Sequence, residues 1–460
     1  MKKEKNERTI ANRLCLTGRG ERGIFLHLPV SAVVRQSGRL RSMRYQTAKG
    51  DIFEPGLMPY QEALSRILNG VSTVSDSEPV TLERACGRIL HRHVVSAINV
   101  PAHTNSGVDG YALHAADIAE DGSARLLIKD TALAGEKYSG AIGRGECLRI
   151  MTGAAVPEPL DTVVMQEHVE IEGDYIKLNY RYKAGKNVRH VGEDIKAGET
   201  VLAAGRRLTP PDVGLFASLG ICEVEVRRRL KIAIASTGNE VKLPGQPLPA
   251  GGLYDSNRYS LMSALSRPDV EIIDLGILPD NVDALLKSFN EAGERADVVI
   301  SSGGVSVGEA DFTKLALRQS GQVDFWRVAI KPGRPLAYGR IGAAAFFGLP
   351  GNPVAVMVTF YFFVLPAIEK MLGITDQPIV PVFKARASED LRKLPGRTEV
   401  QRAIISRDEN GEWQVRTTGR QGSGMLSSMS RANAFIILDH DRDRVSAGES
   451  VDVKPFSALF

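Results

Sequence analysis

A glycine-rich stretch between residues 296 and 311 carries the residue types needed to bind an anion. Residues 298–300 form a β-branched run typical of a buried parallel strand. The sequence Ser-Ser-Gly-Gly follows at 301–304, and a helix is expected to begin near Asp311. A strand, a loop of small residues and a helix N-terminus together present backbone N–H groups and the helix dipole to a ligand.

The spacing from Gly303 to Gly308 imitates a Walker A loop, but Glu309 stands where the phosphate-binding lysine of that loop belongs. The stretch is therefore not an ordinary nucleotide triphosphatase loop. A tight turn between a strand and a helix, without any ligand, is the alternative interpretation of the same residues.

Charged residues follow other expected strands of this region. We expect strands at 231–236, 271–277, 325–330 and 344–347. If these strands are parallel, their carboxyl ends lie at one edge of the sheet, where open α/β folds bind ligands. The residues expected at that edge are Glu240, Asp280, Asp311, Lys331 and Arg334.

Two kinds of chemistry fit these side chains. Asp280 and Asp311 have the carboxylate oxygens that Mg²⁺ takes together with phosphate oxygens. Lys331, Arg334 and Arg327 have the charge to neutralise a phosphate or another oxyanion, and arginine offers two donors in a fixed fork. The alternatives stay open at this point, because each aspartate also fits a helix cap and Lys331 also fits a solvated turn.

Helices are expected to alternate with these strands, at 257–266, 281–293 and 353–371. Asn352 has the residue type of an N-cap, and Pro353 that of a first helical position. The apolar run 354–368 is shorter than the ~20 residues of a membrane span and contains a proline, so we expect a buried helix. This alternation predicts a doubly wound, mainly parallel sheet.

The flanking sequence has a different character. Helical segments are expected at 60–68, 82–95 and 212–219. Short strands marked off by glycines predict a small β domain over residues 113–187, and Asp109 lies in a turn-rich loop just before it. After residue 377, strands expected at 380–383, 399–406, 413–418 and 434–438 predict a small barrel or sandwich.

These patterns divide the chain into five expected parts. They are an extension at 1–50, an N-terminal domain built from 51–97 and 188–229, an inserted β domain at 98–187, the α/β domain at 230–378 and a C-terminal β domain at 379–460. We expect the extension to be disordered or to precede the natural start, at Met43 or Met58.

Charge and cysteine usage narrow the class of protein. The net charge over 460 residues is +4, and residues 1–50 carry a local +9, which leaves −5 for the rest. A mildly acidic body does not indicate a nucleic acid or membrane surface as partner. The cysteines form no CxxC pair, which predicts free thiols in a reducing, cytoplasmic compartment; they are Cys15, Cys86, Cys147 and Cys222.

Taken in order, the motifs resemble those of the molybdopterin molybdenumtransferase family, to which the E domain of gephyrin is related. The run 301–314 resembles the signature loop of molybdopterin-binding proteins. Six further segments match in the right order: 106–112 (Ser-Gly-Val-Asp-Gly-Tyr-Ala), 149–154 (Arg-Ile-Met-Thr-Gly-Ala), 192–194 (Gly-Glu-Asp), 236–240 (Ser-Thr-Gly-Asn-Glu), 329–335 (Ala-Ile-Lys-Pro-Gly-Arg-Pro) and 349–353 (Leu-Pro-Gly-Asn-Pro). The resemblance runs from about Leu57 to the C-terminus.

The resemblance implies an elongated homodimer of four-domain protomers, with a molybdopterin-binding α/β domain and an active site shared between protomers. It implies insertion of molybdate into adenylylated molybdopterin, with Mg²⁺ and with release of AMP. Contact with molybdopterin adenylyltransferase and with molybdoenzyme apoproteins is also implied. The positions matched as catalytic are Asp109, Thr152, Arg189, Asp194, Glu240, Asp280, Asp311 and Lys331, with Asp280 and Asp311 as metal ligands. The positions matched as cofactor-binding are Gly303, Gly304, Ser306, Gly308, Arg327, Arg334, Pro350 and Asn352.

The chain departs from the family pattern in three places. Gly107-Val108 replaces the usual Ala-Met, Asn239 replaces the usual aspartate before Glu240, and arginines stand at 327 and 334 where lysines are common. These changes bear on affinity or rate more than on the type of reaction.

Two other functions are compatible with the same sheet. One is the preceding step, adenylylation of molybdopterin by ATP, against which the flanking β domains argue. The other is a non-catalytic scaffold that binds the cofactor, as gephyrin is at synapses, against which the lack of a long linker argues.

Overall fold

The computed structural model describes residues 45–46, 52–53, 56–304, 312–375 and 382–456. Its central element is a six-stranded sheet in the order β18-β15-β19-β23-β22-β20. Neighbouring strands from β18 to β23 are parallel, whereas β22 is antiparallel to both of its neighbours. The bounds are β15 Leu230–Thr237, β18 Val270–Leu278, β19 Val298–Ser302, β20 Gly321–Arg327, β22 Pro335–Ile341 and β23 Ala344–Leu349.

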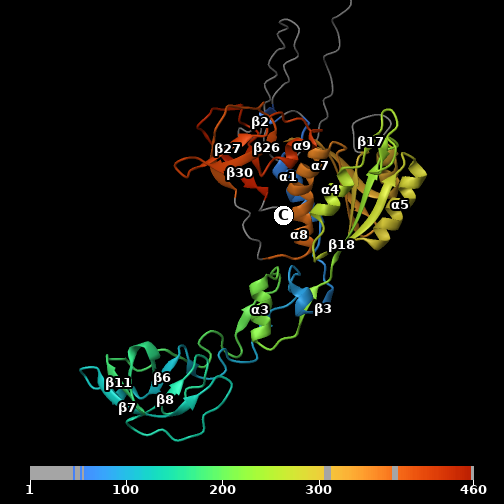
Figure 1. Ribbon diagram of the computed structural model, residues 1–460. Coiled ribbons are helices and arrows are strands. Elements are labelled where there is room, and N and C mark those ends of the chain that lie inside the picture. Colours follow the sequence, from blue (N-terminus) through green and yellow to red (C-terminus); the bar gives the residue numbers. More distant parts are fainter. Residues whose placement is uncertain (1–44, 47–51, 54–55, 305–311, 376–381, 457–460) are drawn as a thin grey trace, which may run out of the picture. The chain divides into compact units, whose positions relative to one another are not determined.

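Different helices cover the two faces of this sheet. In β15, Ile232 and Ile234 pack into the cluster that contains α4, α7 and α8, whereas Ala233 and Ala235 pack with α5 and α6. Figure 1 shows α4 and α5 on opposite sides of the sheet. Successive side chains of a strand point to opposite faces, so a strand covered on both faces is apolar throughout. The helices are α4 Asn257–Ala264, α5 Val282–Arg295, α6 Phe312–Ser320, α7 Pro353–Thr359 and α8 Leu365–Met371. The predicted doubly wound sheet is confirmed.

A π-helical segment, η3 (Phe360–Val364), joins α7 and α8 into one helix over Pro353–Met371. Its length and mean hydropathy of 1.7 would allow a membrane span, but 83% of its most apolar window is buried inside the protein. The predicted buried helix is confirmed. Pro353 begins it as expected, whereas the side chain of Asn352 makes no capping hydrogen bond.

One expected strand is wrong in its extent. The strand predicted at 325–330 ends at Arg327, and residues Ile330–Lys331 form a separate strand, β21, which pairs in parallel with β26 of the C-terminal part. The antiparallel strand β22 was not predicted at all. The first error arises because β26, a distant segment, provides a pairing partner for Ile330 and Lys331. The missed strand β22 instead pairs with β20 and β23, its neighbours in sequence.

A second six-stranded sheet, in the order β10-β11-β7-β8-β6-β9, is made within the predicted small β domain. Its strands are β6 Gly110–Leu113, β7 Ser123–Ala132, β8 Glu146–Ile150, β9 Thr162–Met165, β10 Glu170–Glu172 and β11 Tyr175–Asn179, with 3₁₀ turns η1 Ala115–Asp117 and η2 Gln166–His168. Tyr111, Cys147 and Val164 pack on one face, and Leu148, Ile150 and Val163 on the other.

Short elements flank this sheet in sequence. They are β1 Tyr45–Gln46, β2 Ile52–Phe53, α1 Tyr60–Gly70, β3 Ser77–Thr81, α2 Leu82–Ala85, β4 Val94–Val95, β5 Asn105–Ser106, β12 Val188–Arg189, β13 Thr200–Leu202, α3 Pro210–Ser218 and β14 Glu223–Arg227. The helical stretch predicted at 82–95 is wrong beyond Ala85. Gly87 adopts φ +80°, and Ile89 and Leu90 instead form β-bridges to Arg207 and Val226.

The C-terminal strands close into a barrel rather than a sandwich. β28 pairs with both β30 and β26, which joins the two ends of the sheet β26-β27-β24-β30-β28. A turn joins β26 to β27, and within it Gly411 N donates to Asp408 O. Asp408-Glu-Asn-Gly411 has the residue types of such a hairpin turn. The elements are β24 Phe383–Ala387, β25 Leu391–Arg392, β26 Thr398–Arg407, β27 Trp413–Thr417, α9 Leu426–Ser430, β28 Ala434–Leu438, β29 Arg444–Val445 and β30 Ser450–Pro455.

The cysteines in the described part of the chain are free thiols, as predicted. Cys86 and Cys222 are exposed and Cys147 is buried, which raises its pKa to about 12. Cys15 lies outside the described residues.

Candidate functional site

A cavity of about 750 Å³ opens at the carboxyl edge of the central sheet. The segments that follow β15, β18, β19 and β23 all contribute to its wall, because these four strands are parallel and end at the same edge. Six residues expected from the sequence line it: Glu240, Asp280, Gly303, Gly304, Pro350 and Asn352. The segments after these four strands therefore lie together at one edge of the sheet, as predicted.

Asp280 lines the cavity and does not cap the helix that follows it. The N-cap of α5 is Asn281, whose side-chain oxygen accepts a hydrogen bond from Ala284 N at 2.9 Å. The carboxylate of Asp280 accepts from the backbone of Asn239 at 3.3 Å. With the capping role assigned to its neighbour, this carboxylate is available to a ligand.

The glycines after β19 are required by close packing. Gly304 has φ +67°, and a Cβ at this position would overlap the hydroxyl of Thr313 in α6. Gly303 has φ +95°, and a Cβ there would lie 2.8 Å from the carbonyl oxygen of Thr237. The loop thus brings its backbone against β15 and α6 at the cavity, which only glycine permits.

We therefore expect Gly304→Ala to disrupt the cavity as well as to destabilise the protein. The matched control is Gly342→Ala, because Gly342 has a similar φ of +58° but no atom closer than 3.6 Å to the added Cβ. Positive φ alone costs about 1–2 kcal/mol. Urea unfolding should show a larger loss of stability for Gly304→Ala than for the control. Equal losses would mean that the contact with Thr313 is not a constraint.

Two buried polar atoms at the cavity have no hydrogen-bond partner among the residues that the structure describes. They are Thr313 Oγ1 and Asn257 Oδ1, and both residues line the wall. The other side of the Asn257 amide is fixed, since its Nδ2 donates to Ser302 Oγ and to Gly351 O, each at 2.8 Å. Buried polar groups normally find partners, so these two atoms leave hydrogen bonds that a ligand or a water molecule can complete.

The sequence did not predict Asn257 as a site residue, nor the hydrogen bonds of the neighbouring Asp255 and Arg258. Asp255, also on the wall, accepts from Ser236 Oγ at 2.8 Å and from Arg258 Nε at 2.8 Å. Arg258 is buried and also bonds Asp274. The segment Asp-Ser-Asn at 255–257, where the expected helix begins, has the residue types of an N-cap, so the sequence offered no signal that it borders a site.

The C-terminal barrel also reaches the cavity, through Gly424. The fully buried Arg402 holds the preceding loop: its Nε donates to Ser428 Oγ and its Nη2 to Gly422 O, each at 3.0 Å. Ser423 O in turn accepts from Val354 N at the start of α7. Burial lowers the pKa of Arg402 to about 10. Nothing in the alternation of β26 distinguishes this arginine in the sequence.

The predicted cations are not part of this wall. The described residues that line the cavity include Glu240 and Asp280 but neither lysine nor arginine. Lys331 lies in β21, where its Nζ contacts Glu399 Oε2 of the barrel at 3.2 Å. Lys331 follows β20, which runs in the same direction as the parallel strands and therefore ends at the same edge of the sheet. The connection is not a free loop there, because the backbone of Lys331 forms the short strand β21 and pairs with β26 of the barrel.

A separate group of expected residues lies around β5, β12 and β8. Asp109 Oδ1 accepts two hydrogen bonds from Thr152, one from the hydroxyl and one from the backbone N–H, each at 2.7 Å. Arg189 pairs with Asn105 through the β12–β5 ladder, and Asp194 N donates to Val100 O at 3.0 Å. The structure thus joins Asp109 directly to Thr152. It places Arg189 in β12 and Asp194 in the bend that follows this strand.

The Thr152 contacts hold the pKa of Asp109 below its usual value, mainly through the hydroxyl. We expect Thr152→Val to raise this pKa, measured by a ¹³C NMR titration of the carboxyl group. Ser123→Ala is the control, because Ser123 makes the same pair of hydrogen bonds to Asp121. A carboxyl whose pKa is lowered stabilises the fold above its unfolded pKa, and this stabilisation is lost as pH falls through the folded value. An Asp109 pKa that does not move in Thr152→Val would contradict this assignment.

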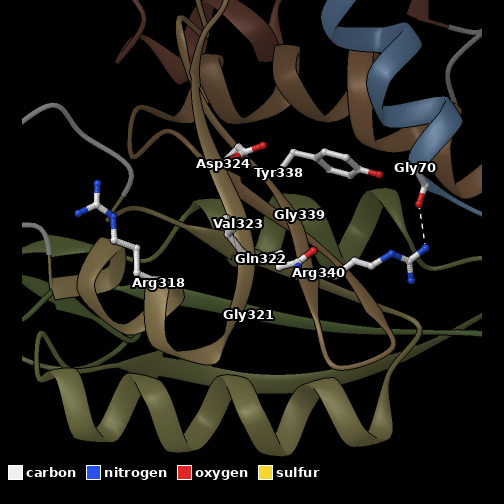
Figure 2. A pocket seen from close by; sticks show the side chains of 9 residues that line it. All are labelled: Gly70, Arg318, Gly321, Gln322, Val323, Asp324, Tyr338, Gly339 and Arg340. Atoms are coloured by element: carbon white, nitrogen blue, oxygen red, sulfur yellow. Dashed lines mark hydrogen bonds between the residues drawn. The ribbon is translucent and has the colours of Figure 1, made fainter.

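A second cavity, of about 530 Å³, lies beside β20 and β22 and is shown in Figure 2. Arg340 on its wall donates to Gly70 O at 2.9 Å. None of the described residues on this wall was expected to bind a ligand, and Tyr338 in it bonds the carbonyl of Ile67. We therefore do not assign it as the candidate site.

Ser306, Gly308 and Asp311 of the predicted site lie outside the described residues.

Three family models match the chain in consecutive order. They are the MoeA N-terminal region (domain I and II) over residues 58–220, the probable molybdopterin binding domain over 233–370 and the MoeA C-terminal region (domain IV) over 384–456. A molybdopterin molybdenumtransferase of Haemophilus influenzae is 42% identical over 404 residues, which cover 88% of this chain and 100% of that relative. The chain belongs to the molybdopterin molybdenumtransferase family.

Further relatives agree with this membership in an enzyme family of molybdenum cofactor biosynthesis. The molybdopterin molybdenumtransferase of Bacillus subtilis is 31% identical over 404 residues, covering 86% of this chain and 93% of that relative. The crystal structure of a molybdopterin biosynthesis moeA protein from Pyrococcus horikoshii OT3 has a TM-score of 0.77 and 30% identity, covering 87% of this chain and 100% of that one.

The structure shows the surroundings of two departures from the molybdenumtransferase family pattern. Asn239 Oδ1 accepts from Asp280 N at 3.2 Å, so Asn239 and Asp280 bond each other reciprocally across two loops. An aspartate at 239 would supply the same acceptor but add a negative charge to the cavity edge. At Gly107 a Cβ would meet Asn187 O at 3.4 Å and Arg189 Nε at 3.5 Å, which is ordinary contact. The alanine common in the family therefore fits there.

Proposed function

We propose that this chain inserts molybdate into adenylylated molybdopterin and releases AMP and molybdenum cofactor. The observation that carries the proposal is the convergence of four strand-end segments on one cavity that contains Glu240 and Asp280. The unpartnered atoms of Asn257 and Thr313 support it, because they leave hydrogen bonds for a polar ligand to complete.

Mg²⁺ fits the donor set of this cavity. A phosphate beside Glu240 and Asp280 meets like charges, and two unit charges about 4 Å apart interact by about 4 kcal/mol near a protein surface. A cation between them removes this repulsion, and Mg²⁺ typically takes one or two carboxylates together with phosphate oxygens. When bound, it would neutralise charge on the phosphate groups. No group of three or more His, Cys, Asp or Glu converges among the residues described, so substrate oxygens would have to complete the coordination.

The residues of this chain then have distinct tasks. Glu240 and Asp280 orient the phosphate end of the ligand, the glycine loop admits it close to the backbone, and Asn257 and Thr313 bond its polar edge. Lys331, Arg327 and Arg334 supply positive charge for molybdate. A dianionic oxyanion needs such donors to offset the loss of its hydration.

We further propose a cytoplasmic homodimer in which the Asp109 group of one protomer completes the cavity of its partner. The support is that Asp109 and Thr152 bond each other in one group, whereas Glu240 and Asp280 lie in another group at the cavity. Each group is held by contacts within its own part of the chain.

The test is AMP release from adenylylated molybdopterin by the purified chain, with and without molybdate and Mg²⁺. We expect release that requires both. AMP release that is independent of molybdate would contradict insertion. Pyrophosphate release from ATP, with formation of adenylylated molybdopterin, would instead assign the preceding adenylylation step.

A further inference from the structure

Glu399 of the C-terminal barrel is a buried carboxylate that contacts a predicted catalytic lysine. Its side chain is 6% exposed, and its Oε2 lies 3.2 Å from the ammonium of Lys331, whose side chain is 46% exposed. The two residues are direct partners in the parallel pairing of β21 with β26. The contact therefore joins the loop between β20 and β22 to the barrel.

The second oxygen of Glu399 is also fixed. Gln401 Nε2 donates to Glu399 Oε1 at 3.0 Å and to Arg392 O at 3.3 Å. Lys393, also buried, lies near this carboxylate, and its Nζ donates to three barrel carbonyls, with Arg442 O the nearest at 2.7 Å. Glu399 is thus held by the barrel on one side and by Lys331 on the other.

The backbone that carries Lys331 has little freedom to relocate. Ile330 is fully buried, and Thr398 N donates to Ala329 O at 2.9 Å. Gly333 has φ +110°, and a Cβ there would lie 2.6 Å from the methyl group of Thr359. The backbone at Lys331 is therefore fixed, and the contact with Glu399 sets the direction of the lysine side chain.

We propose that Glu399 is a positioning residue for Lys331 in the transfer of molybdate, an inference that rests on the proposed function. A lysine ammonium has three N–H donors. One is used on Glu399, and two remain for an oxyanion. The carboxylate holds the ammonium in place and, by its negative charge, also weakens the attraction of the site for a free anion.

Two opposite kinetic effects follow for Glu399→Gln, which keeps the shape and removes the charge. We expect kcat to fall about tenfold because Lys331 is no longer held, and KM for molybdate to fall about threefold because a nearby negative charge is gone. A purely structural defect would not lower both together. The control is Glu412→Gln, which removes an exposed carboxylate that pairs with Arg386 at 2.9 Å on the same barrel. It should change neither constant.

A measurement independent of catalysis separates this inference from the proposed function. Acetylation of Lys331 by an N-hydroxysuccinimide ester, followed by mass spectrometry, reports how firmly Glu399 holds the lysine amino group. We expect the rate to rise about fivefold in Glu399→Gln and to stay unchanged in Glu412→Gln. Gln401→Met frees the other oxygen of Glu399 and should give a smaller rise. If Glu399→Gln fails to fold, the acetylation rate of Lys331 in Gln401→Met tests whether Glu399 holds the lysine.

The outcomes are distinct. Equal acetylation of Lys331 in all variants overturns the inference, whatever the activity. Faster acetylation with unchanged kcat also overturns it, because Glu399 would then hold the lysine without any effect on transfer. If the wild type shows no molybdate-dependent AMP release, the proposed function fails and the positioning role falls with it, while acetylation still reports the contact.

Discussion

Asp280→Asn and Glu240→Gln are each expected to lower kcat for molybdate-dependent AMP release by about 10²–10³-fold. Both carboxylates line the cavity at the ends of parallel strands, and each is proposed to orient the phosphate end of the ligand. The substitutions keep the side-chain shape but remove the charge that would hold Mg²⁺.

The control for this pair is Asp283→Asn. Asp283 is exposed in the first turn of α5, three positions after Asp280, and is not part of the cavity wall. It should leave kcat unchanged. If Mg²⁺ binds through Asp280, the concentration of Mg²⁺ needed for half-maximal rate should also rise in Asp280→Asn. If kcat and the Mg²⁺ requirement are unchanged in both cavity variants, the cavity takes no part in the reaction.

Mixed dimers are expected to recover activity that neither parent has. In a homodimer with shared sites, a protomer carrying Asp109→Asn still offers an intact cavity, and one carrying Glu240→Gln still offers an intact Asp109 group. The purified heterodimer should therefore have one intact site of two and about half of the wild-type rate. Each parent homodimer has both sites damaged.

The matched control is a heterodimer in which each protomer carries a substitution in its cavity. A heterodimer of Glu240→Gln with Asp280→Asn has no intact site in any arrangement, so no recovery is expected. If the Asp109→Asn and Glu240→Gln heterodimer is as inactive as its parents, the two groups act within one protomer and the shared site is wrong.

The central sheet could be predicted from sequence because its strands are covered on both faces. The run from Leu230 to Ala235 is nearly continuous in apolar residues, and helices of ordinary length separate it from β18 and β19. Once the strands are parallel, the position of Glu240, Asp280 and Gly303 at one edge follows from geometry alone.

Contacts between distant segments explain what the sequence did not reveal. Lys331 lies in a short strand only because β26, almost seventy positions later, pairs with it. The helix expected beyond Ala85 is replaced by bridges from Ile89 and Leu90 to segments more than a hundred positions away. Asn257 borders the cavity because α4 begins there. The expected domain boundaries and the status of residues 1–50 stay predictions.

The most direct measurement is a crystal structure of this protein with adenylylated molybdopterin and Mg²⁺. We predict electron density for the ligand in the cavity between Glu240, Gly304 and Asn352, with its phosphate groups toward Glu240 and Asp280 and hydrogen bonds to Asn257 and Thr313. Density in the cavity beside Tyr338 and Arg340, with the carboxyl edge of the sheet empty, would contradict the assignment of the site.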